Sequence, residues 1–212
     1  MRRGLVVALA VLVTGCGGGV EGTAVPAPTG GLDSVLLSDV ELDELLHTSG
    51  FHSDPDGREF TDELANGTRP PGCVHTVDIA DRNVYRDGGP TAILTRASDS
   101  PAGSVRQSVV VVRSAKDARR ILDMSKLSWD VCVGVPVTTG GPAPVTWERE
   151  PVEVSDGIAS QRTTRSDRVG EQCQHAMGAA VATVVEAMVC GPGVTNEAAA
   201  AVAEMARNAD RS

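Results

Sequence analysis

The chain has 212 residues, a length that fits one folded domain of ordinary size. Its formal net charge is −9 at pH 7, which argues against binding to nucleic acid or to anionic headgroups through charge. Aromatic residues make up only 2% of the chain, so a core must be built mainly from Val, Leu and Ala.

The first residues form an export signal rather than part of the fold. Basic MRR is followed by the apolar run GLVVALAVLV and by VTGC, which matches a bacterial lipobox with Cys16 at the +1 position. The run of about ten apolar residues is too short to span a bilayer as a helix, so residues 1–15 are predicted to be a cleaved lipoprotein signal peptide. The pattern predicts lipid on Cys16, which anchors the protein at the extracytoplasmic face of the cell membrane. An ordinary signal peptide with an incidental cysteine is the alternative.

Residues 16–31 are the predicted lipidated cysteine and a flexible linker. The stretch GGGVEGTAVPAPTGG has too little apolar surface to fold and is expected to act as a tether. It contains a formal G-x-G-x-x-G from Gly17 to Gly22, but a dinucleotide site needs a strand before that motif and a helix after it. We therefore reject a dinucleotide site and expect the folded domain over residues 32–212.

The first elements of the domain are marked by capping and turn signals. Ser38 and Glu41 have capping-box spacing, which predicts a helix over residues 38–47. A second helix is predicted from about Cys73 to Tyr85, after a pair of prolines. Two strands joined by a short turn are expected next, at residues 91–98 and 105–113.

The second half continues with a helix, short strands and a closing helix. Ser114 and Asp117 form another capping signal before a helix that runs toward Trp129. Asp156-Gly157 lies between two extended runs and predicts a hairpin. The closing helix is expected at residues 195–207, with Thr195 as a candidate cap. Strands that follow strands, with few helices, indicate an α+β fold with an antiparallel sheet.

The five cysteines of the chain indicate its disulfide content. With Cys16 assigned to lipid, an even number remains in an oxidising compartment, which predicts two disulfides. The remaining four, which allow three pairings, are Cys73, Cys132, Cys173 and Cys190. No C-x-x-C pair is present to start a metal site.

The apolar stretch from Cys173 to Cys190, CQHAMGAAVATVVEAMVC, looks at first like a buried helix. In one straight helix its cysteines would be about 25 Å apart, whereas a disulfide needs Cα atoms roughly 4.4 to 6.8 Å apart. If these two cysteines pair, the stretch must fold back, most simply as two antiparallel strands. If they pair elsewhere, a helix is allowed, and local sequence does not choose.

Three segments, in their order and spacing, resemble the PknH-like extracellular sensor domain family: PPGCVHTVDIADRNVY, QSVVVVRSAKDARRILDMSKLSWDVC and the stretch just described. The most specific parts are W-x-x-C at Trp129 and Cys132 and the CQ…C pair. The resemblance covers roughly residues 33–208. The family includes the outer domain of a mycobacterial receptor Ser/Thr kinase and many lipoproteins without a kinase.

The resemblance implies an antiparallel sheet flanked by helices, with a cleft. It also implies that Cys73 pairs with Cys132 and Cys173 with Cys190, so that the second pair staples two strands. One departure is visible. The family often has Asn near the middle of the last segment, where this chain has Val181 and Ala182.

No catalytic or metal-binding motif stands out. The sequence contains no G-x-S-x-G nucleophile elbow, and the domain cysteines are expected to be oxidised. His47 and His52 lie near Asp54 and Asp56, but the spacing fits no zinc pattern. We therefore predict a protein that is not an enzyme and that carries no metal or cofactor.

Three residues are weak candidates for binding a ligand: Trp129, Trp147 and His175. The tryptophans could line a cleft, although a domain so poor in aromatics also needs them for core packing. His175 follows Cys173 by two residues, so on a strand both side chains point to the same face. A buried, hydrogen-bonded imidazole is the alternative role.

Two functions from different classes follow. In the first, the membrane-anchored domain binds a small molecule, a lipid or a cell-wall fragment in its cleft. In the second, it docks without a ligand on another envelope protein, such as a receptor kinase. Nucleic acid is not an expected partner of either.

Overall fold

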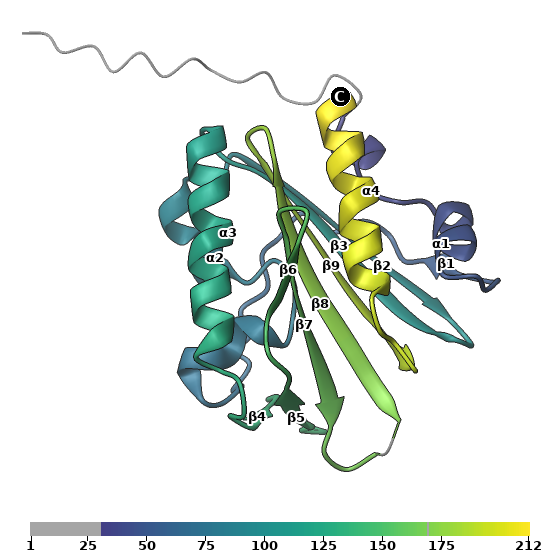
Figure 1. Ribbon diagram of the computed structural model, residues 1–212, viewed down its shortest axis with the longest axis vertical. Coiled ribbons are helices and arrows are strands. Elements are labelled where there is room, and N and C mark those ends of the chain that lie inside the picture. The colour runs from purple at the N-terminus through teal and green to yellow at the C-terminus, as the bar shows by residue number, and fades with distance from the viewer. Residues whose placement is uncertain (1–30, 169) are drawn as a thin grey trace, which may run out of the picture.

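Nine strands form one antiparallel sheet, and four α-helices pack against it within the described chain (Figure 1). The computed structural model describes residues 31–168 and 170–212, so the predicted signal peptide and Cys16 lie outside the described residues. Neighbouring strands follow the order β1-β2-β3-β9-β8-β7-β5-β4, and β6 pairs with β7. The strands are β1 (His52–Ser53), β2 (Ala92–Ser100), β3 (Gly103–Val111), β4 (Val137–Thr138), β5 (Thr146–Arg149), β6 (Glu153–Ser155), β7 (Ile158–Arg165), β8 (Glu171–Ala180) and β9 (Thr183–Pro192).

The helices lie on both faces of the sheet. The α-helices are α1 (Asp39–Leu45), α2 (Arg82–Tyr85), α3 (Ala115–Asp130) and α4 (Glu197–Arg211), and the 3₁₀ helices are η1 (Leu32–Ser34), η2 (Pro71–Thr76) and η3 (Arg86–Gly88). α1 and α4 pack on one face, and α2, α3 and η2 cover the other. Figure 1 shows α3 and α4 on either side of the long strands. None of the helices described here is long and apolar enough to cross a membrane.

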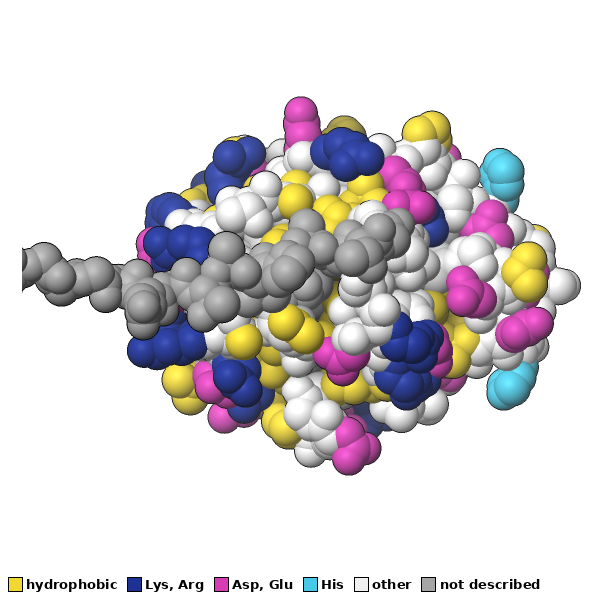
Figure 2. Space-filling view, turned by 90° about the horizontal axis from the view of Figure 1, so that it is seen from above, with side chains coloured by type: hydrophobic (Ala, Val, Ile, Leu, Met, Phe, Trp, Pro, Cys, Tyr) yellow, Lys and Arg dark blue, Asp and Glu magenta, His cyan; other side chains and the backbone are white. Residues whose placement is uncertain are grey.

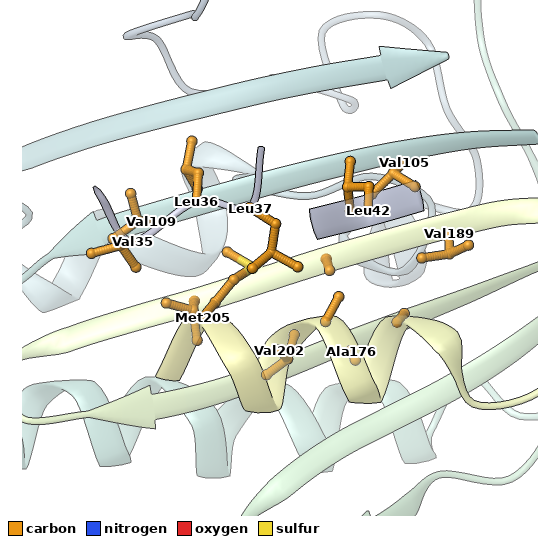
Figure 3. Close-up of a cluster of buried hydrophobic side chains, with 14 of the residues drawn as sticks. Val35, Leu36, Leu37, Leu42, Val105, Val109, Ala176, Val189, Val202 and Met205 are labelled. Carbon is orange, nitrogen blue, oxygen red and sulfur yellow. The ribbon is translucent and has the colours of Figure 1, made fainter. Parts of the chain in front are cut away.

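The core under α4 is built mainly from Val, Leu and Ala, as the composition predicts, with Met205 and Phe51 as larger members. Figure 3 shows Met205 of α4 reaching toward Val35 and Leu37 of the segment before α1. Gln107 of β3 fixes that segment, because its buried side-chain amide accepts from Leu37 N at 2.8 Å and donates to Leu37 O at 3.0 Å. The two hydrogen bonds replace the strand pairing that the segment lacks.

The core under α3 contains the two largest buried side chains, Trp129 and Tyr85. The helix predicted to run toward Trp129 is α3, and its buried residues are Ala118, Ile121, Leu122, Ser125 and Trp129. Ser114 caps the helix by accepting from Asp117 N at 3.2 Å. The capping residue and the packing of the buried face therefore both favour a helix in this segment.

Both disulfides implied by the family resemblance are present. Cys73 of η2 bonds Cys132, just after α3, and Cys173 bonds Cys190. Cys173 and Cys190 are direct partners in the β8–β9 ladder, with Cα atoms 4.0 Å apart. The Ala-rich stretch is therefore a hairpin whose two strands are central in the sheet, which is why it is apolar on both faces.

Most of the predicted elements are confirmed. The capping box of Ser38 and Glu41 starts α1, and β2 and β3 form the first predicted hairpin. Asp156 and Gly157 connect β6 to β7, both with positive φ. Each of these is a short-range signal that needs no distant partner.

Two local predictions are wrong. Residues 73–85 do not form one helix, because η2 ends at Thr76 and α2 starts only at Arg82. The chain between them is held by distant groups, since Ala80 N donates to the Glu186 carboxylate at 3.2 Å. Thr195 does not cap α4 either. The N-cap is Asn196, whose side chain makes no capping bond.

Candidate ligand-binding site

A pocket of about 310 Å³ lies on the α3 side of the sheet, beyond the part that the helix layer covers. Its floor is the Cys173–Cys190 disulfide together with Met188 and Thr163. Its walls come from three separate parts of the chain. The wall residues are Val77, Ser104, Arg106, Thr139, Val145 and Trp147.

Strand alternation brings the floor residues to this face. Cys173 pairs with Cys190 and with Thr163 across the ladders, and Cys190 pairs with Ser104. Met188 lies two residues before Cys190 and so points the same way. The disulfide is thus part of the pocket surface as well as a staple between strands.

Trp147 is the large aromatic side chain of the pocket wall and is only partly buried. It lies on β5, opposite Arg165 of β7 and Val137 of β4. Its carbonyl accepts from the buried Arg149 at 2.9 Å, and Arg149 also donates to the Thr76 hydroxyl of η2. Burial lowers the pKa of Arg149 to about 10. The hydrogen bond from Arg149 to Thr76 connects the short β5 strand to the helix layer.

Arg106 supplies the charge of the pocket. Its guanidinium contacts Asp78 at 2.6 Å, and its side chain remains 53% exposed while that of Asp78 is buried. Burial raises the pKa of Asp78, with Arg106 opposing that rise, and Asp78 raises the pKa of Arg106. Arg106 is therefore charged, and its exposed donors can bind a carboxylate or a phosphate.

A buried polar network lies next to the pocket, under α3. The Glu186 carboxylate accepts from the Tyr85 hydroxyl and lies 2.9 Å from His175 Nε2. The His175 ring packs on Trp129, with ring centroids 4.5 Å apart. Burial is the main cause that raises the pKa of Tyr85. The network joins α2 and α3 to the two central strands.

The three candidate ligand residues separate into two groups. Trp147 lines the pocket, whereas Trp129 of α3 and His175 of β8 are buried between the helix layer and the sheet and contact each other. Their assignment to a ligand stays a prediction. Sequence reasoning missed Arg106, which sits in a strand without any motif. It also missed Glu186, although a single acid inside an apolar run is a visible signal.

The arrangement is suited to binding. The pocket combines an aromatic side chain, apolar floor groups, hydroxyls and one cation, which is the usual composition of a small-molecule site. The two cysteine sulfurs of the pocket are joined in a disulfide. Within residues 31–168 and 170–212, no set of three His, Cys, Asp or Glu side chains is placed to hold a metal ion.

The sequence matches the PknH-like extracellular domain family over residues 27–208. The serine/threonine-protein kinase PknH of Mycobacterium tuberculosis (strain ATCC 25618 / H37Rv) is 28% identical over 174 residues, which are 79% of this chain and 27% of that kinase. PknH of Mycobacterium bovis (strain ATCC BAA-935 / AF2122/97) is also 28% identical, over 29% of its length. The chain therefore spans less than a third of these curated relatives.

A solved structure has the same fold. The crystal structure of the extracellular domain of PknH from Mycobacterium tuberculosis matches with a TM-score of 0.79 at 24% identity, over 85% of this chain and 95% of that domain. Both likenesses point to an extracellular domain rather than to a catalytic kinase domain. The described domain is thus of an extracytoplasmic type.

Proposed function

Because the chain belongs to the PknH-like extracellular domain family, we propose that it is an extracytoplasmic lipoprotein with a ligand-binding sensor domain. Lipid on Cys16 anchors it to the cell membrane, and the domain takes a small molecule, a lipid or a cell-wall fragment without chemical conversion. The lipobox and the linker of the sequence support the anchor.

One observation carries the ligand proposal, namely the opening of the α3 layer above the Cys173–Cys190 disulfide. The pocket there is about 310 Å³, which is within the range of small-molecule sites. Trp147 offers a flat apolar surface and Arg106 an anion-binding group. We therefore expect a ligand that has an apolar or sugar-like face and an acidic group.

Tryptophan fluorescence tests the proposal directly. The chain has two tryptophans, and only Trp147 is accessible, since Trp129 is buried. Acrylamide should therefore quench Trp147, and a bound ligand should protect it. Peptidoglycan fragments and short-chain phospholipids are the two probe classes, added to the mature domain exported into an oxidising compartment.

Variants define where a protecting probe binds. Arg106→Gln should weaken binding of an acidic probe about tenfold or more, the equivalent of one lost charged hydrogen bond. The matched control is Arg162→Gln, because Arg162 is also half-buried in an ion pair but lies outside the pocket. Equal loss in both variants would contradict binding at this pocket.

Native mass spectrometry of the same protein covers ligands outside those classes. A copurified mass that denaturant releases identifies the natural ligand. A clean mass with both disulfides, together with no protection by either probe class, would reject the ligand proposal.

Docking on another envelope protein, such as a receptor kinase, is the second candidate. A specific observation favours it, since the outer face of α3 carries Met124, Leu127 and Val131 in exposed positions. In that case no ligand is needed and the apolar face is the functional surface.

A further inference from the structure

The outer face of α3 has an unusual concentration of exposed apolar side chains. Met124 is 55% exposed, Leu127 64% and Val131, just after the helix, 74%. The other large exposed hydrophobic residues of the described chain are scattered over separate elements: Val40, Leu64, Val154 and Val181. Single exposed side chains are ordinary, but a contiguous set on one helix indicates a contact surface.

The spacing of this surface matches helix pairing. Arg120, Met124, Leu127 and Val131 follow one another at intervals of four, three and four residues, the spacing of the a and d positions in a coiled coil. We call these four residues the α3 stripe. The opposite face of α3 is already buried on the sheet, so Met124, Leu127 and Val131 form a second, exposed apolar face of this segment. Arg120 lies at its end, where it donates to the Asp87 carbonyl of η3 at 2.8 Å.

We propose that the α3 stripe pairs with the α3 stripe of a second copy of this chain, with the two helices antiparallel about a twofold axis between Met124 and Leu127. Such an interface is self-complementary, because each residue of the stripe meets a different residue of the other copy. Met124 then lies opposite Leu127 in two equivalent layers at the centre.

Charge selects the antiparallel direction. A parallel pair would place Arg120 against Arg120 and Asp130 against Asp130, which repel. In the antiparallel pair Arg120 of one copy is level with Asp130 and Val131 of the other, so opposite charges close both ends. Both residues are exposed, and Arg120 keeps 45% of its side chain accessible beside its contacts with Asp117 and with the Asp87 carbonyl.

The charges of α3 as a whole are also distributed unevenly along the helix, with basic residues toward its start. The first turns of α3 carry the exposed cations Lys116, Arg119 and Arg120 beside Asp117. The later turns carry Asp123, which pairs with Lys126, and the exposed Asp130. Figure 2 shows Lys and Arg gathered at the left side of the molecule, where α3 lies in Figure 1, with Asp and Glu more frequent on the opposite side. On a chain with net charge −9, this basic end favours one orientation of approach.

The described structure leaves the stripe open to such a partner. α3 contacts β7, β8, β9, η2, η3 and α2, all on its inner side or one flank. A pair through one helix face is smaller than a standard stable interface, so a weak, concentration-dependent dimer is expected in solution. Confinement of two anchored copies to a membrane would raise their effective concentration.

Sedimentation equilibrium of the mature, non-lipidated domain tests the proposal, from micromolar to millimolar concentration. The parent protein should show a reversible monomer–dimer equilibrium. Leu127→Asp should raise the dissociation constant at least about tenfold, as expected for a central apolar contact. Val154→Asp is the matched control, because it changes an exposed valine outside the stripe and should leave the dimer intact.

A charge exchange tests the direction of the helices. Arg120→Asp and Asp130→Arg should each weaken the dimer, and the double variant should regain most of the affinity. A monomer at every concentration, or a dimer indifferent to Leu127→Asp, would refute the proposal. Two weakening single variants without recovery in the double variant would refute the antiparallel arrangement.

The test is independent of the proposed ligand site. Trp147 lies on β5 and takes no part in the α3 stripe, so Leu127→Asp should leave acrylamide quenching of Trp147 unchanged. Failure to find a ligand would leave the sedimentation result standing, and a monomeric protein could still bind a ligand.

Discussion

Val181 shows a conflict between a residue and its backbone. It is the first of the two residues that connect β8 to β9, and it has φ of 50° with half of its surface exposed. A β-branched side chain is poorly tolerated in this left-handed region, whereas Asn is several-fold enriched there. Val181 therefore holds this turn at a cost in stability that Asn would reduce.

Val181→Asn should therefore stabilise the protein by about 1 kcal/mol, the lower end of the cost of a left-handed residue with a Cβ atom. Chemical denaturation measures the change. Val154→Asn is the control, because Val154 is similarly exposed but lies in strand β6. Equal stabilisation by Val154→Asn, or no stabilisation by Val181→Asn, would contradict the view that the left-handed backbone of Val181 lowers stability.

His75 is a largely buried imidazole whose Nε2 atom has no hydrogen-bond partner. Burial is the main cause that lowers its pKa from 6.5 to about 4, and His175 and Arg149 add to the effect. The folded protein therefore keeps His75 neutral at pH values where the unfolded chain would bind a proton.

Stability should fall with acidification because of this residue. The contribution of neutral His75 to the free energy of unfolding is fully present above pH 6.5. It is lost as the pH falls toward 4, because the unfolded state binds the proton at a higher pH than the folded state does. The loss amounts to at most about 3 kcal/mol. Asp78 acts with the opposite sign because its pKa is raised, so the parent must be compared with His75→Gln in denaturation series between pH 7 and 4. If the free energy of unfolding changes with pH by the same amount in both proteins, His75 plays no part in the acid sensitivity.

At the scale of elements, the two disulfides close loops of very different length. Cys73 and Cys132 are 59 residues apart and join η2 to the end of α3, whereas Cys173 and Cys190 are 17 apart within one hairpin. In the chain-entropy model, the longer loop restricts the unfolded chain more strongly.

Removal of the longer bridge should therefore cost more. The double variant Cys73→Ala with Cys132→Ala is expected to lose about 4 kcal/mol, and Cys173→Ala with Cys190→Ala about 3 kcal/mol. Urea denaturation under oxidising conditions measures both. A larger loss of stability in the Cys173→Ala, Cys190→Ala variant would mean that this disulfide stabilises the pairing of β8 with β9 directly, in addition to restricting the unfolded chain.

At the scale of the whole molecule, stability comes from the two layers of side chains between helices and sheet. Met205 lies in the layer under α4 and is fully buried, whereas Met124 lies on the outside of α3. Met205→Ala should cost about 2 to 5 kcal/mol through lost burial and a cavity, and Met124→Ala less than about 0.5 kcal/mol in dilute solution. Comparable losses would contradict the assignment of the core. Thermal unfolding of both variants provides the comparison.

Short-range signals predicted the elements that depend on them. The capping residues Ser38 and Ser114 start α1 and α3 as expected, and the Asp156-Gly157 turn forms its hairpin. These features need only neighbours within a few residues, so the same interactions act in any tertiary context.

Long-range contacts decided the rest. The interval between η2 and α2 depends on Glu186, about a hundred residues later, whose carboxylate binds Ala80 N and the Tyr85 hydroxyl. No local pattern contains that partner. The sequence also offered Trp129 and Trp147 as equal ligand candidates. Only the packing of α3 on the sheet makes its own Trp129 a core residue, whereas Trp147 on β5 becomes part of a pocket wall.

The sequence by itself determined the composition of the core, the α+β class, the number of domain disulfides and the family. The tertiary structure decided that the hairpin from Cys173 to Cys190 lies in the middle of the sheet, that its disulfide forms the floor of a pocket, and that α3 keeps an apolar outer face. The physical reason is that periodicity and capping report on neighbours along the chain, whereas burial depends on which distant segment covers a given side chain.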